Sequence, residues 1–126
     1  MKIYLAHPVT DYGTKRQADA IAYIREGGFE VENPDQPHHQ RGYEERGMDY
    51  FKEVVAACDG LVFLRFPDGS VGAGVGREIW WALKANKNVW ELFGGRLYWC
   101  ADKPTPVLSV DETRATIARI REEPHQ

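Results

Sequence analysis

Short apolar runs alternate along this chain with stretches of helical periodicity, and this alternation limits the possible folds more than any other feature. Strands that alternate with helices indicate a layered α/β fold with right-handed crossover connections. We predict strands at residues 3–6, 29–33, 61–66 and 88–92, and helices at residues 15–26 and 51–58, over a segment that contains Glu78, and at residues 109–122.

The run LVFLRF, at residues 61–66, lacks polar alternation and is typical of a strand buried on both faces of a parallel sheet. We therefore expect a flavodoxin-like (Rossmann-like) α/β fold, a three-layer sandwich with a mainly parallel sheet of about five strands in the order 2-1-3-4-5. In that order the first and third strands are neighbours where the winding reverses. The loops that follow them would face one pocket, where ligands bind in such sheets.

Three segments carry local signals. NVWELFGGRLYWC has two aromatic-rich runs around a Gly-Gly pair, which predicts an antiparallel hairpin. DQPHHQRGYEERG is polar and has no period, so we expect a long surface loop at residues 35–47. Ser109 and Glu112 match the capping box that opens a helix.

The composition bounds the class of protein. We expect residues 1–126 to form a single domain, and no apolar run approaches the ~20 residues of a membrane-spanning helix. The first residues, MKIYLAHPVT, are more typical of a strand than of a signal peptide, so we predict a cytoplasmic protein with no membrane partner. The net charge of −3 argues against duplex nucleic acid as a partner. Cys58 and Cys100 are far apart, which indicates neither a zinc nor a redox motif.

The stretch SVGAGVGREIWWAL places Gly72, Gly74 and Gly76 before Glu78 at the start of an apolar helix. The spacing fits neither a Walker loop nor a dinucleotide fingerprint. Backbone N–H groups of such a loop can approach a sugar or a phosphate. We expect Glu78 in or near the first helical turn, where the helix dipole favours an ionised carboxylate that could act as nucleophile or base. A flexible turn with a solvated glutamate fits the spacing equally well.

Four segments together resemble the nucleoside 2-deoxyribosyltransferase superfamily, which includes nucleoside deoxyribosyltransferases and nucleotide N-hydrolases. They are KIYLAHPV at the start, NP after the second strand, CDGLVFL after the second helix, and GVGREIWWA. The likeness covers roughly the first 90 residues in the same order. It implies cleavage or transfer of the N-glycosidic bond of a small nucleoside or nucleotide.

The resemblance also implies roles for three residues. The catalytic glutamate of the superfamily falls on Glu78, whose carboxylate would attack the anomeric carbon and form a covalent glycosyl intermediate. The first-strand tyrosine that orients this glutamate falls on Tyr4. A family acid that precedes the third strand is matched only by Asp49, two residues early, while Phe51 stands at the expected position.

Substrate-binding residues are expected from both loops. Thr10 and Arg16 could bind a phosphate at the start of the first helix, and His7 could contact the base. In the glycine-rich loop we expect contacts from Gly72, Gly74 and Gly76. The superfamily commonly has Asp or Ser where this chain has Gly72, and Ser70 is a nearby substitute.

No cofactor is expected, and no metal, since His38 and His39 lack carboxylate or cysteine partners at ligand spacing. The superfamily implies a homo-oligomer, a dimer or larger. Two alternatives to the enzyme stay open. Gly72 and Phe51 favour a non-catalytic nucleotide-binding module of the same fold, and the aromatic hairpin would suit an interaction domain.

Overall fold

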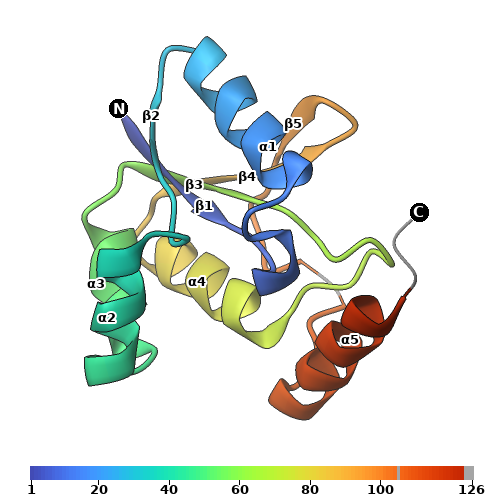
Figure 1. Ribbon diagram of the computed structural model, residues 1–126. Helices are drawn as coiled ribbons and strands as arrows, with labels where there is room; N and C mark the ends of the chain where they lie inside the picture. Colours follow the sequence, from blue (N-terminus) through green and yellow to red (C-terminus); the bar gives the residue numbers. More distant parts are fainter. Residues whose placement is uncertain (105, 124–126) are drawn as a thin grey trace.

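The computed structural model describes residues 1–104 and 106–123 and contains one five-stranded sheet (Figure 1). The strand order is β2-β1-β3-β4-β5, which confirms the predicted flavodoxin-like order. The first four strands in this order are parallel and β5 is antiparallel to β4. The bounds are β1 Lys2–Ala6, β2 Glu30–Glu32, β3 Gly60–Phe63, β4 Asn88–Phe93 and β5 Arg96–Trp99.

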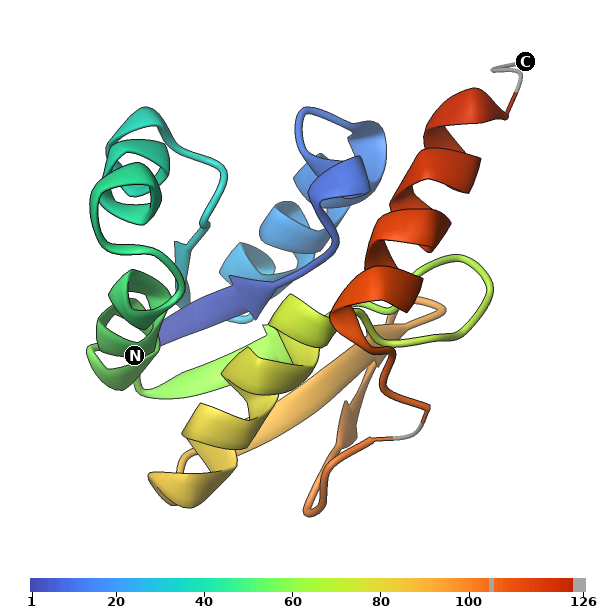
Figure 2. The same cartoon turned by 90° about the horizontal axis from the view of Figure 1, so that it is seen from below.

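Helices cover both faces of the sheet, which gives three layers (Figure 2). One face packs against α1 (Lys15–Glu26), through Ala20 and Ile24. The other face packs against α3 (Asp49–Ala56) and α4 (Ala73–Lys84), through Val55 and Ile79. The remaining helices are α2 (Pro37–Arg46), α5 (Val110–Glu122) and a short 3₁₀ helix, η1, at Val9–Asp11.

The pairing of β1 with β3 positions the site. Tyr4 is opposite Leu61 and Ala6 is opposite Phe63, so the two strands end side by side. The chain leaves β1 through η1 and leaves β3 through a loop that precedes α4. Strand β1 has parallel neighbours on both sides, and it is here that the order of the strands reverses.

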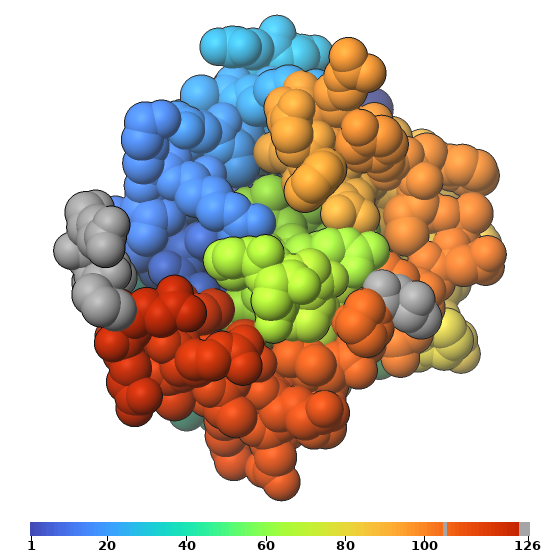
Figure 3. Space-filling view, turned by 90° about the vertical axis from the view of Figure 1, so that its right-hand side faces the viewer, coloured from blue at the N-terminus to red at the C-terminus, as the bar shows by residue number. Residues whose placement is uncertain are grey.

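The β3–α4 loop is held between distant parts of the chain, and Figure 3 shows it between α5 and the β4–β5 hairpin. Asp68 pairs with Arg119 of α5 at 3.1 Å, and Arg65 pairs with Glu91 of β4 at 2.9 Å. Val71 forms a parallel bridge with Val107 just before α5 begins. The last helix is therefore anchored to the loop that introduces α4.

The prediction of a loop at residues 35–47 is wrong, because most of this segment forms α2. Pro37 stands at its start, where a missing N–H is harmless, and Gly47 with a φ of 68° ends it. Only His39 of this helix is buried, so the segment has no apolar period that could have predicted a helix.

The other local predictions are confirmed. Strands β4 and β5 form the antiparallel hairpin, and Gly94 and Gly95 both adopt the positive φ that such a tight turn requires. Ser109 and Glu112 form the capping box of α5. Among the described residues, no helix is both long and apolar enough to cross a membrane.

Candidate functional site

A pocket of about 230 Å³ opens where β1 and β3 end. Its walls come from five parts of the chain: β1 and the loop after it, the segment from β2 to α3, the β3–α4 loop, α4, and α5. Its lining consists of Tyr4, His7, Pro8, Val9, Tyr12, Pro34, Gln40, Tyr43, Met48, Phe51, Phe66, Gly72, Gly74, Val75, Glu78, Thr113 and Ile117.

Glu78 and Tyr4 meet in this pocket. Glu78 is carried by α4, whose residues Val75 and Ile79 pack into the core over β1 and β3. Its side chain is 7% exposed, and the fully buried Tyr4 of β1 donates its hydroxyl to Glu78 Oε2. One carboxylate oxygen is thus held by β1, so the carboxyl group has a defined direction within the pocket.

Glu78 lies near the first turn of its helix but not in it. Helix α4 begins at Ala73, so Glu78 is its sixth residue and lies in the second turn. The dipole effect is concentrated in the first turn, and burial dominates instead. Burial raises the pKa of the Glu78 carboxyl to about 8, although the Tyr4 hydrogen bond acts in the opposite direction.

Tyr4 stays protonated beside Glu78, as a neutral phenol. Burial, and then the adjacent charge of Glu78, raise the pKa of Tyr4 well above its ordinary value. A neutral hydroxyl has one proton to donate, and that of Tyr4 is directed at Glu78. Tyr4 can therefore stabilise the ionised Glu78 carboxylate while it keeps its own proton.

His7 lines the pocket and is 4% exposed. Its Nδ1 lies 3.0 Å from the Leu5 carbonyl oxygen, and its Nε2 lies 2.6 Å from Gln17 Oε1. Gln17 in turn donates from Nε2 to Asp35 Oδ2 at 2.9 Å. Sequence reasoning missed Gln17 and Asp35, since nothing local in the sequence links residues of α1 and the β2–α2 connection.

The three glycines have different surroundings. Gly72 and Gly74 line the pocket, as expected. Gly76 does not line it, because it packs against Val107, and a Cβ there would lie 2.7 Å from Val107 Cγ1. Gly76 therefore serves packing. The first N–H of α4, that of Ala73, donates to Thr113 Oγ1 of α5 at 2.8 Å.

Four other predicted site residues do not line the pocket. Asp49 is exposed at the start of α3, and Thr10 is half-buried in η1. Arg16 donates to Asp11 Oδ2 at 2.6 Å and to the Arg65 carbonyl oxygen at 2.7 Å. Ser70 is buried, and its hydroxyl donates to Asp68 at 2.6 Å. In this structure Arg16 and Ser70 hold loops together.

Sequence reasoning also missed most of the apolar wall. The ring centroids of Tyr43 on α2 and Phe51 on α3 are 5.9 Å apart, and Ile117 lines the pocket from α5. Phe51 could be assigned from the sequence only to a buried helix face. The role of α2 was hidden by its polar sequence, and the role of α5 depends on a distant chain contact.

In the folded chain, the Glu32 carboxylate lies near His38 and His39, although no carboxylate stands at ligand spacing in the local sequence. The ligand atoms of Glu32, His38 and His39 lie within 4.8 Å of one another. However, His39 Nε2 is already 2.5 Å from Glu32 Oε1, and its Nδ1 is 2.6 Å from the Tyr50 hydroxyl. Both ring nitrogens are engaged in a hydrogen-bond network that needs no ion.

No protein-family model matches the chain, and no curated protein matches it significantly. Among solved structures, the Clostridium botulinum CMP N-glycosidase BcmB is similar, with a TM-score of 0.50 and 22% sequence identity. The match covers 71% of this chain and 66% of that chain, so this chain spans just under two thirds of that enzyme's length. At this identity the similarity establishes a shared α/β fold.

Proposed function

We propose that this protein cleaves the N-glycosidic bond of a small nucleoside or nucleotide, with Glu78 as the nucleophile. The observation that carries the proposal is a buried carboxyl group, oriented by the Tyr4 hydroxyl, in a pocket at the reversal point of the sheet. Reactive carboxyl groups with a raised pKa are frequent in active sites. The fold shared with a CMP N-glycosidase agrees with the proposal.

The chemistry follows from the geometry of the pair. The ionised Glu78 attacks the anomeric carbon with one oxygen while Tyr4 holds the other. The bond from the sugar to the base breaks, its electron pair goes to the base nitrogen, and the base leaves as it takes up a proton from solvent. Water then attacks the anomeric carbon of the glycosyl ester, gives its oxygen and one hydrogen to the sugar and its other proton to solvent, and releases the carboxylate, with net retention at the sugar carbon. A second base in place of water would give transfer.

Aromatic rings supply a surface for the base. Tyr12, Tyr43, Phe51 and Phe66 all line the pocket, and a nucleobase can stack on such rings. Asp49 has no part in this proposal, because its exposed carboxyl lies outside the pocket.

The test is release of free base from a panel of nucleosides and nucleotides, separated by chromatography. We expect the wild type to release base and Glu78→Gln to lose at least about a thousandfold in rate. Glu30→Gln, which changes an exposed carboxyl on β2, is the matched control and should keep full activity. Equal rates in Glu78→Gln and the wild type would exclude Glu78 as nucleophile.

A non-catalytic nucleotide-binding module is the second candidate. It is favoured by Gly72, which leaves the pocket without the polar side chain of the superfamily, and by the Glu78 pKa of about 8, which keeps much of this group protonated at neutral pH. Binding of panel members without any base release would support the module.

We also propose that the protein forms a homo-oligomer through the β4–β5 hairpin. Trp99 is opposite Trp90 and Leu97 is opposite Leu92, so these side chains share the sheet face next to α1. Trp99 is 69% exposed, and an apolar groove of about 420 Å³ runs between α1 and this hairpin. Exposed apolar patches of this kind are frequent at subunit interfaces.

A further inference from the structure

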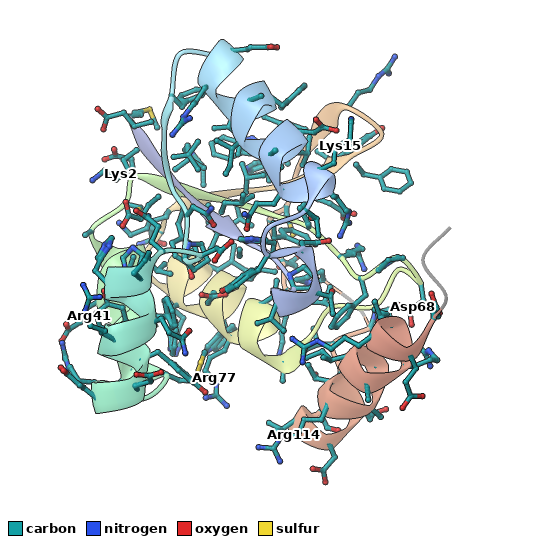
Figure 4. The ribbon with its side chains drawn as sticks, in the orientation of Figure 1. Lys2, Lys15, Arg41, Asp68, Arg77 and Arg114 are labelled. Atoms are coloured by element: carbon teal, nitrogen blue, oxygen red, sulfur yellow. The ribbon has the colours of Figure 1, made fainter. Side chains whose placement is uncertain are left out.

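The pocket described above lacks basic side chains, and this bears on which substrates it can hold. Among the described residues, no lysine or arginine lines it. The cationic side chains labelled in Figure 4, Lys2, Lys15, Arg41, Arg77 and Arg114, lie at the periphery of the molecule, and none lines the pocket. Proteins that hold a phosphate group usually direct Arg or Lys at it.

The nearest candidates for a phosphate contact are committed elsewhere. Arg16, on the first turn of α1, is bound to the Asp11 carboxylate and to the Arg65 carbonyl oxygen. His7 is the lining side chain that could carry a positive charge, but its ring nitrogens are bonded to Leu5 and Gln17. Neither residue presents an N–H group to a ligand in the pocket.

The carboxyl groups beside the pocket oppose a bound phosphate when they are ionised. Burial raises the pKa of Tyr12, and the negative charges of Glu78 and Asp35 raise it further, so both carboxylates act on the volume that Tyr12 lines. Because Glu78 must be ionised to act as the proposed nucleophile, a phosphate in the reactive complex would meet a like charge in a partly dehydrated site, which is strongly unfavourable without a cationic partner.

The polar groups that remain on the wall are neutral. They are the phenols of Tyr12 and Tyr43 and the amide of Gln40, set among aromatic and aliphatic side chains. Such groups match sugar hydroxyls and the edge of a base, and the rings match its faces.

We infer that the pocket takes an uncharged nucleoside and discriminates against the corresponding 5′-monophosphate. The inference rests on the proposed function for the reaction, and it separates this chain from the CMP N-glycosidase that shares its fold. The selectivity comes from the absence of lysine and arginine among the described residues of the wall, together with the Glu78 and Asp35 carboxylates when they are ionised.

The test compares matched pairs, uridine with UMP, cytidine with CMP, and their 2′-deoxy forms. We expect kcat/KM for base release to favour the nucleoside of the preferred pair by at least about tenfold. Equilibrium titration of the same pairs, which needs no turnover, should show the same order of affinities. Equal or better use of the monophosphate would overturn the inference while leaving the proposed reaction intact.

Two variants of opposite charge test the cause. Gln40 is exposed at the pocket wall, so Gln40→Lys and Gln40→Glu should both fold. We expect Gln40→Lys to reduce the preference for the nucleoside and Gln40→Glu to increase it, by several-fold each. The same ratio in both variants would contradict an electrostatic origin.

The outcomes also separate the two proposals. Selective nucleoside binding with no base release would support the inference and count against catalysis. Failure of every compound to bind or react would overturn both proposals.

Discussion

At the scale of single residues, Glu78 combines two properties that oppose each other. Its carboxyl is buried in an apolar region, which favours the neutral form, yet its proposed role requires the charged form. Tyr4 reduces this conflict by donating a hydrogen bond to the carboxylate. The remaining cost of ionising Glu78 should be measurable in the pH dependence of both the free energy of unfolding and the rate of base release.

The pKa of Glu78 is about 8 in the folded protein against an ordinary value of 4.5. Between these pH values only the folded chain retains the proton, so the free energy of unfolding falls as pH rises. This contribution is complete below pH 4.5 and is lost as pH passes about 8. Base release should rise over the upper part of this interval, because the carboxylate is the nucleophile.

Glu78→Gln removes the titrating group and should remove this slope. We expect the variant to be more stable than the wild type at pH 9, by about 2–4 kcal/mol, and the difference to shrink toward acid pH. Urea unfolding of both proteins at pH 5, 7 and 9 measures it. If the free energies of unfolding of the two proteins changed with pH in the same way, Glu78 would not be a buried acid with a raised pKa.

At the scale of secondary-structure elements, α4 depends on a close contact at Gly76. A Cβ at this position would lie 2.7 Å from Val107 Cγ1, whereas one at Gly74 would find its nearest neighbour, Met48 Cε, at 3.9 Å. We expect Gly76→Ala to lower the free energy of unfolding by about 1–3 kcal/mol. Gly74→Ala should be neutral or stabilising by up to about 1 kcal/mol, because alanine favours the helix.

Chemical denaturation of both variants measures these differences. Val107→Ala combined with Gly76→Ala should recover part of the loss, since it removes the atom that the new methyl meets. Equal stability of the two alanine variants would mean that α4 does not approach the segment before α5 so closely.

The sequence predicted those elements whose signals are local. The Gly-Gly turn, the capping box and the apolar strands each depend on a few adjacent residues, and the structure confirms them. Helix α2 was missed because it buries only His39 and has no apolar stripe.

Only part of the candidate site could be predicted from the sequence. The pairing of Glu78 with Tyr4 could be expected from a family resemblance, and the structure places the two in contact. The contributions of Thr113 and Ile117 depend on where α5 packs, which no local pattern contains. The raised pKa of Glu78 likewise depends on burial rather than on its position in the sequence.

At the scale of the whole molecule, the β4–β5 hairpin leaves Trp99 exposed on the face next to α1. We expect light scattering to give a mass above the 14.4 kDa of a single chain. Trp99→Lys should shift the protein toward monomer, because it places a charge where apolar contact is expected. Glu122→Gln, which changes the net charge equally on α5, is the control and should leave the mass unchanged. A wild-type monomer would exclude the proposed assembly.

The anchoring of α5 to the β3–α4 loop has a consequence for the order in which the protein matures on the ribosome. All five strands and Glu78 precede residue 100, so a nascent chain can complete its sheet before α5 has emerged. Two pocket residues, Thr113 and Ile117, and the bridge at Val107 are translated after all five strands. Competence to bind ligand should therefore appear only after α5 docks, later than the sheet.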